Sequence, residues 1–227
     1  MNKNLLIISI CFLTFFSSAQ IHEVGIWGGG ANFIGDVGKT NYIAPNKIAV
    51  GIIYKYNKSK RLTYRFSYIH GSIAGYDIES DVPARNERDY RFKNKVNELN
   101  AGLEFNFLDF DLHLLERQIT PYISSGIAAF QYDELFFRNG VQRKDDGKWG
   151  FGIPMIVGVK TSIMRQLVLG IEAGARYTYT DNIDGSNPSN ESLAPFRFGN
   201  INSNDWYVFT GFTLTYTFGK NPCYCPY

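Results

Sequence analysis

The three histidines are the first residues to consider, because a histidine beside a serine or an aspartate is the usual arrangement of a hydrolase. Only His70 stands near the long-loop end of a predicted strand, and Ser72 and Asp77 are close to it along the chain. The alternating pattern around His70 places it on the apolar face of its segment, and a catalytic triad is defined by geometry instead of proximity in sequence. We therefore expect that the chain is not an enzyme.

Two of the three cysteines, Cys223 and Cys225, stand near the end of the chain on either side of Tyr224. Two thiolates alone cannot complete a four-ligand zinc site, and a disulfide is the usual state of thiols in an oxidising compartment. Tyr224 adds an aromatic side chain of the kind that interfaces favour. We interpret the three residues as a disulfide or a partner-docking element, with a metal half-site and free thiols as alternatives, and we expect no cofactor.

Many charged residues stand in segments where apolar and polar residues alternate, and they share the face opposite the apolar residues. A lipid environment would enforce this pattern, because a charge on the lipid face costs about 2–4 kcal/mol at the membrane midplane. Glu23, Lys47 and Arg61 belong to this set. Its central members are predicted to form a charge network in a shared lumen: Glu98, Glu104, Lys160, Glu172, Arg176, Lys55 and Arg65.

The segments that must position these charges are eight predicted strands, because alternation with period two recurs along the chain. The last one is the clearest, with Trp206, Phe212 and Leu214 on one face and Thr213, Thr215 and Thr217 on the other. The predicted strands are 23–32, 46–56, 61–71, 96–107, 120–132, 151–162, 167–180 and 205–218.

The connections between these strands alternate in length. The segments 57–60 and 163–166 are short turns and 108–119 is intermediate, whereas 33–45, 72–95, 133–150 and 181–204 are predicted to be long loops. Short turns at one end and long loops at the other are typical of outer-membrane barrels. Alternation alone also permits a soluble lipocalin-like barrel or sandwich, but aromatic residues at the strand ends favour the membrane. The predicted fold is therefore all-β, an eight-stranded antiparallel transmembrane β-barrel with long extracellular loops and short periplasmic turns.

Residues 1–19 are predicted to be a signal peptide. Lys3 supplies the positive start, Leu5–Phe16 is apolar but too short to span a membrane, and Ser17–Ala19 provides the small residues of a cleavage site. The barrel then occupies residues 20–218, and 219–227 form a periplasmic tail. Export and barrel type together predict a location in the outer membrane.

The amino-acid composition excludes several other classes of protein. Aromatic residues make up 16% of the chain and charged residues 19%, against about 25% charged in average soluble domains. The mean hydropathy of −0.19 is too polar for a helical membrane protein, and the hydrophobic content excludes a disordered chain. A net charge of +2 gives no electrostatic footprint for nucleic acid.

Several segments resemble a Bacteroidetes family of outer-membrane barrels, the PorG component of the type IX secretion system, which is also catalogued as a domain of unknown function. The resemblance covers most of the mature chain, and its most specific parts are the Gly-Asp-Val-Gly loop and the Asn-Asp-Trp-Tyr strand entry. The segments that carry it are Ile26–Gly38, Tyr42–Asn46, Tyr54–Asn57, Asn204–Gly211 and Tyr216–Gly219.

The resemblance implies a barrel associated with a periplasmic ring formed by proteins like PorK and PorN, and it carries no catalytic residues. The first functional hypothesis is therefore a secretion component that anchors or docks this ring. The alternative is a stand-alone surface barrel for adhesion or for binding small molecules or lipopolysaccharide. Outer-membrane lipid and lipopolysaccharide are expected contacts in either case, and nucleic acid is not.

Overall fold

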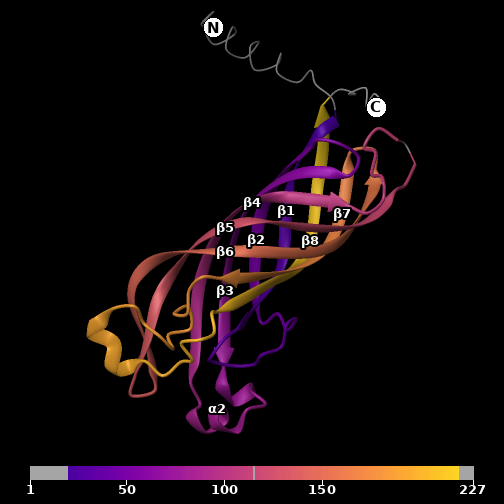
Figure 1. Cartoon of the computed structure of the whole chain (residues 1–227). Coiled ribbons are helices and arrows are strands. Elements are labelled where there is room, and N and C mark those ends of the chain that lie inside the picture. The colour runs from indigo at the N-terminus through magenta and orange to yellow at the C-terminus, as the bar shows by residue number, and fades with distance from the viewer. Residues whose placement is uncertain (1–19, 115, 220–227) are drawn as a thin grey trace, which may run out of the picture.

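Eight antiparallel strands close into one barrel in the computed structural model, which describes residues 20–114 and 116–219. Each strand pairs with its neighbours in the sequence, and β1 closes the barrel against β8 (Figure 1). The strands are β1 (Gln20–Ile34), β2 (Lys47–Asn57), β3 (Leu62–Tyr76), β4 (Arg91–Asn106), β5 (Ile119–Arg138), β6 (Val141–Met164), β7 (Leu167–Thr178) and β8 (Trp206–Gly219). The predicted eight-stranded fold is confirmed. The predicted signal peptide and the segment with Cys223, Tyr224 and Cys225 lie outside the described residues.

The barrel is strongly sheared. A path that starts at His22 of β1 and steps from each residue to its partner on the next strand returns to β1 at Asn32. The stagger around the barrel is therefore ten residues. Such a stagger tilts the strands against the barrel axis, and eight strands at this tilt leave an interior that side chains just fill.

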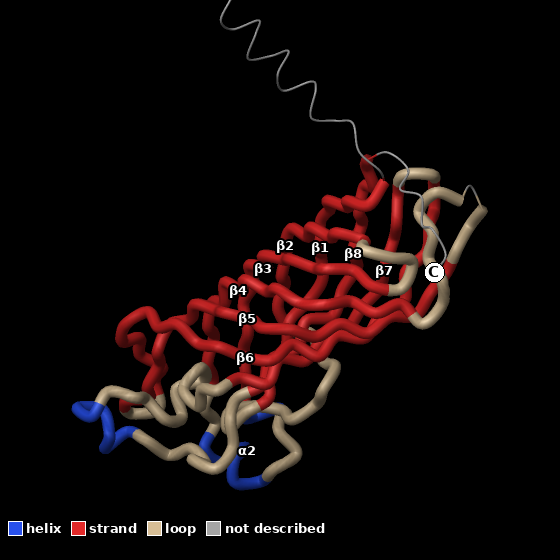
Figure 2. The backbone as a smooth tube through the Cα atoms, turned by 45° about the horizontal axis from the view of Figure 1, so that its top comes forward, coloured by secondary structure: helices blue, strands red, loops and turns tan. Residues whose placement is uncertain are grey.

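The two ends of the barrel differ. The short connections, 58–61, 107–118 and 165–166, lie at the end where β1 begins and β8 finishes. The other end carries the long loops with three short helices, which Figure 2 shows gathered on one side of the strands: η1 (Asp77–Glu79), α2 (Pro83–Arg88) and η2 (Glu191–Phe196). In the described part of the chain, no helix is long and apolar enough to cross a membrane.

The prediction of a long loop at 133–150 is wrong. β5 and β6 continue through this segment and meet at a tight turn of Asn139 and Gly140, both with positive φ (53° and 75°). Asn-Gly with two positive φ angles is the preferred sequence of a two-residue hairpin turn. In this extension β6 carries polar residues on both faces, from Gln142 to Asp146, and β5 has three successive apolar residues, Leu135–Phe137. Neither strand alternates here, and alternation was the signal on which the prediction depended.

Alternation sorts side chains into an interior and an exterior face as predicted. On β4, Glu98 and Glu104 are fully buried, whereas Leu99 and Leu103 are about half exposed. One predicted inward charge is wrong: Arg61 precedes β3, is exposed, and pairs with Asp109 of the neighbouring turn (Nε to Oδ1, 2.5 Å). Lys47 is only half-buried, because it stands at the rim where β2 begins.

Candidate functional site

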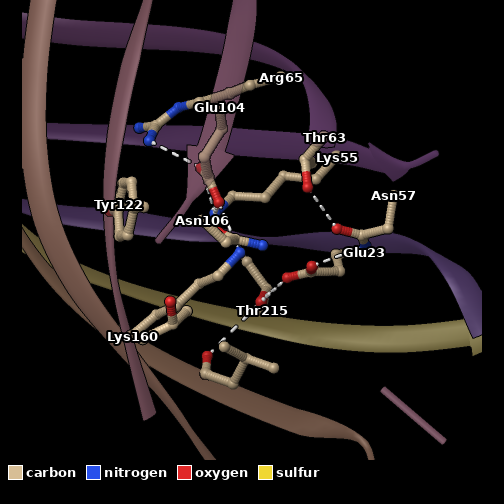
Figure 3. A network of polar contacts seen from close by, with 12 residues as sticks. Glu23, Lys55, Asn57, Thr63, Arg65, Glu104, Asn106, Tyr122, Lys160 and Thr215 are labelled. Carbon is tan, nitrogen blue, oxygen red and sulfur yellow. Dashed lines mark hydrogen bonds and ion pairs between the residues drawn. The ribbon is translucent and has the colours of Figure 1, made fainter. Parts of the chain in front are cut away.

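The centre of the lumen is an ion cluster around Glu104 of β4 (Figure 3). Lys55 of β2 places its Nζ 2.7 Å from Glu104 Oε2, and Lys160 of β6 places its Nζ 2.6 Å from Oε1. All three side chains are at most 2% exposed. One buried carboxylate therefore holds two buried ammonium groups.

Arg65 of β3 connects this cluster to a second carboxylate, Glu172 of β7. Its NH1 lies 3.5 Å from Glu104 Oε2, and its NH1 and NH2 donate to the two oxygens of Glu172 at 2.8 and 2.6 Å. Trp27 Nε1 donates to Glu172 Oε1 at 2.9 Å, and the Tyr122 hydroxyl donates to Oε2. Glu172 is thus fully coordinated by hydrogen bonds from β1, β3 and β5.

A third carboxylate, Glu23 of β1, belongs to the same layer (Figure 3). It accepts hydrogen bonds from Asn57 Nδ2 at 2.8 Å and from the Thr215 hydroxyl at 2.6 Å. With Glu104 and Glu172 it balances the charges of Lys55, Lys160 and Arg65, and a buried cluster of this kind is stable only when its charges and hydrogen bonds are matched.

Arg176 forms a separate pair nearer the long-loop end. It donates from Nε and NH2 to Glu98 at 3.0 and 3.1 Å, and the Tyr207 hydroxyl donates to the same carboxylate at 2.7 Å. The predicted lumen residues therefore lie in two groups: Glu104, Lys55, Lys160, Arg65 and Glu172 in one, and Glu98 with Arg176 in the other.

Sequence reasoning missed the aromatic residues of the lumen. Trp27, Tyr122 and Tyr207 are buried and donate to the carboxylates described above. Trp27 is four residues after Glu23 on the same strand, so alternation alone already indicates that it lies on the inner face with Glu23. Aromatic residues are also typical of membrane interfaces, and this more familiar role obscured their second role as interior donors.

Apolar side chains close both ends of the ion cluster. At the short-turn end, Phe110 and Leu112 fold back from the connection between β4 and β5 and pack on Val168. The Lys160 ammonium lies 4.9 Å from the centre of the Phe110 ring. At the other end, Trp27, Phe130 and Phe209 belong to a larger buried apolar cluster. Side chains thus fill the lumen from end to end.

Aspartates organise the long loops above the lumen. The Asp184 carboxylate accepts backbone N–H groups of Asp36, Val37 and Ser186 at 2.8–3.1 Å. Asp205 accepts the N–H of Ile183 at 2.9 Å. These hydrogen bonds make the two carboxylates loop anchors. Among the described residues, no group of three or more His, Cys, Asp or Glu is placed to hold a metal ion.

Burial perturbs these loop carboxylates. It raises the pKa of Asp181 to about 6, with the negative charges of Asp36 and Asp184 adding to the effect. Burial also raises the pKa of Asp184. The pKa of Asp205 lies well above its usual range through burial and the charge of Asp184. The loop 179–205 therefore packs against the other loops best when these aspartates are protonated.

We expect docking of this loop to weaken as the pH rises from 5 to 7.5. An unfolded aspartate titrates near a pKa of about 3.9, so in this range the folded state binds more protons and stability falls with rising pH. Backbone hydrogen exchange of residues 181–187, corrected for intrinsic rates, should be better protected at pH 5. Asp205→Asn should reduce the difference, whereas Asp146→Asn on the exposed hairpin should not. Equal protection at both pH values in the unmodified protein would contradict this reading.

The outer wall of the barrel is apolar. Ile26, Ile127 and Val157 expose 62%, 68% and 62% of their surfaces, and an apolar band of this extent is stable only in lipid. Aromatic residues border the band at both ends, where membrane interfaces favour them. They are Tyr54, Phe105 and Phe107 at the short-turn end and Trp149, Phe151 and Tyr179 at the other. The fold is a transmembrane β-barrel of the outer-membrane type.

A model of the family described as "Domain of unknown function (DUF6089)" matches residues 2–227. The chain belongs to the DUF6089 family. No curated protein matches the DUF6089 chain.

Solved barrels are distantly similar to the DUF6089 barrel. Neisserial surface protein A is 11% identical with a TM-score of 0.49, covering 87% of this chain and 97% of its own. Ail of Yersinia pestis, in complex with the heparin analogue sucrose octasulfate, is 10% identical with a TM-score of 0.44, covering 86% and 96%. OprG of Pseudomonas aeruginosa is 10% identical with a TM-score of 0.38, covering 89% and 96%. Likenesses this distant carry no argument about the DUF6089 barrel, whose fold rests on its own strand pairing.

Proposed function

We propose that the DUF6089 barrel is an outer-membrane component of the type IX protein secretion system that anchors or docks the periplasmic ring complex. The chain is exported through a cleaved signal peptide, and its short turns face the periplasm. Its partners are ring proteins similar to PorK and PorN. The resemblance of Ile26–Gly38 and Asn204–Gly211 to the PorG family supports this assignment.

The observation that carries the proposal is the filled lumen. Lys55, Lys160 and Arg65 are paired with buried carboxylates, and Phe110 and Leu112 cover the periplasmic side of the cluster. A barrel of eight strands with an occupied interior offers no wide path for solutes. It is suited to hold a partner at the membrane, and its periplasmic end is where a ring would attach.

The connection 107–118 is the docking element in the described part of that end. Phe110 and Leu112 anchor it inside the barrel, and Lys60 pairs with Asp111 (Nζ to Oδ2, 3.1 Å). Leu114 remains 52% exposed on this anchored turn. A fixed turn that presents an exposed leucine loses little conformational entropy on binding, which favours an interface.

We expect Leu114→Asp to reduce co-purification of the ring proteins about tenfold or more, because removing a central apolar contact commonly costs more than 1 kcal/mol and burying a charge adds to it. The measurement is the amount of ring protein recovered with the tagged barrel from detergent-solubilised membranes. Ile201→Asp, a matched change on an exposed residue of the opposite end, is the control. Equal recovery of ring protein with both variants would exclude the connection 107–118 as the docking element.

The segment with Cys223, Tyr224 and Cys225 is the second docking candidate. We expect deletion of Asn221–Tyr227, and separately the change of both cysteines to serine, to leave barrel insertion intact. Ring recovery and secretion of type IX cargo should both decrease. Normal results for both variants would make the tail dispensable. If the intact barrel recovers no ring protein at all, the secretion assignment is wrong and a stand-alone surface barrel becomes the better reading.

A further inference from the structure

A groove on the outer wall lies where β1, β2, β3 and β4 approach the long-loop end. It has a volume of about 590 Å³, and its walls include Pro45, Ile48, Ser72 and two lysines, Lys47 and Lys93. Gly30 of β1 has no side chain to fill it. The groove therefore combines cationic and apolar walls on the face that meets the membrane.

The lysines stand at the height of the outer headgroups. A membrane-crossing barrel strand needs about 9–11 residues, and β2 has 11 residues, beginning at Lys47. The same length counted up β4 from Asn106 ends at Val96, and Lys95 and Lys93 are the next two outward positions beyond it. Below Lys95 the outward residues are first His70 and Asn97, which are hydrogen-bonded to each other, and then apolar ones such as Leu99, 52% exposed. Val50 beside them on β2 is 53% exposed.

The positive charge of this wall is not neutralised by the carboxylates around it. Glu79 pairs with Lys39 at 3.1 Å and Asp89 pairs with Arg91 at 3.0 Å. In the described chain, Lys93 and Lys95 are exposed and have no ion-pair partner within 4.0 Å. Lys47 donates to the Tyr76 hydroxyl at 2.9 Å, a neutral acceptor that does not cancel its charge.

We propose that this groove binds the phosphorylated headgroup of an outer-leaflet glycolipid, with Lys93 and the adjacent Lys95, whose position on β4 is paired with Ser72 of β3, on the phosphates and Ser72 donating a hydrogen bond. The acyl chains then lie along Ile48 and the apolar wall below it. Charge complementarity identifies the ligand, because basic residues beside a membrane surface attract anionic headgroups. An amphiphile also matches the division of the wall into a cationic upper part and an apolar lower part.

The test measures binding to the full mature barrel in detergent micelles. The probes are lipid A with two phosphates and the same lipid A after phosphatase treatment. We expect the phosphorylated form to bind more tightly, and K93Q/K95Q to weaken its binding about twentyfold, since each basic residue near an anionic surface contributes a factor of about five. R138Q/R143Q removes two exposed charges from the β5–β6 hairpin tip and should leave binding unchanged.

Three results of this binding comparison would overturn the proposal. They are equal binding of both lipid forms by the unmodified barrel, unchanged binding by K93Q/K95Q, and an equal loss in the two double variants. A competition experiment with inorganic phosphate completes the test. If it displaces the lipid completely at millimolar concentration, the site takes free phosphate and the lipid assignment fails. Faster migration of each unboiled variant in SDS shows that the barrels are folded, so that a loss of binding reports on the groove.

Discussion

Replacing Glu104 with glutamine should lower the free energy of unfolding of the barrel by about 3–5 kcal/mol. The carboxylate is the shared partner of Lys55 and Lys160, and both ammonium groups are buried. Without it, two buried cations lose their ion-pair partner in the lumen, and their desolvation is no longer compensated. The measurement is urea unfolding of the folded barrel, followed by tryptophan fluorescence and by mobility in SDS.

The control for this experiment is Glu79→Gln. Glu79 forms an ion pair with Lys39 at a similar distance, 3.1 Å, but both side chains are more than 40% exposed, and exposed pairs contribute about 0–1 kcal/mol. Changing Glu104, Lys55 and Lys160 to methionine together with Glu23→Gln leaves Arg65 matched by Glu172 alone and should recover most of the lost stability, since buried ion clusters can be replaced by uncharged side chains of similar volume. A loss below 1 kcal/mol for Glu104→Gln would show that water reaches the cluster.

Arg65→Lys should destabilise the barrel by about 1.5–3 kcal/mol although it preserves the charge. Arg65 donates from two nitrogens to the two oxygens of Glu172, at 2.8 and 2.6 Å. A lysine cannot reproduce this paired geometry, and a hydrogen bond to a charged group contributes about 1.5–3 kcal/mol. Arg65→Met, which also removes the charge, should cost about 3–5 kcal/mol.

The matched control is Arg61→Lys, because Arg61 pairs with Asp109 in the exposed turn and surface changes usually stay within about 0.5 kcal/mol. The same urea unfolding measurement applies. If Arg65→Lys and Arg61→Lys are equally mild, the bidentate contact with Glu172 contributes nothing specific. Combining Arg65→Met with Glu104→Gln should be non-additive, since the two residues belong to one cluster.

The sequence was sufficient to predict the barrel and, apart from Arg61 in a turn and Lys47 at the rim, the inner position of the charges in its strands. Period-two alternation specifies faces directly, so the residue pattern alone places Glu104 and Lys160 inside. It does not specify which charges meet. Arg176 pairs with Glu98 across β4 and β7, strands that are not neighbours, and this depends on the register accumulated around the whole barrel.

Other features could not be predicted from the sequence, because they depend on how an individual loop folds. Asp77 stands in what the sequence indicates is a solvated loop, yet it is fully buried and accepts the N–H of Gly38 at 2.8 Å and an Arg88 Nε–H at 2.7 Å. A loop that folds on itself provides no periodic signal. The β5–β6 extension did carry a signal, Asn139-Gly140, which indicates a hairpin turn independently of alternation.

The claim on which the account depends is that the charged face of every strand points into a filled lumen while the apolar face meets lipid. Phe212 and Thr213 are adjacent on β8, with Phe212 58% exposed and Thr213 3% exposed. Single cysteines at these two positions, with Cys223 and Cys225 changed to serine, can be compared by lipid-soluble maleimide labelling of the barrel in bilayers. The account predicts rapid labelling at position 212 and protection at 213. Protection at 212 with rapid labelling at 213 would mean that the barrel is inverted relative to this description.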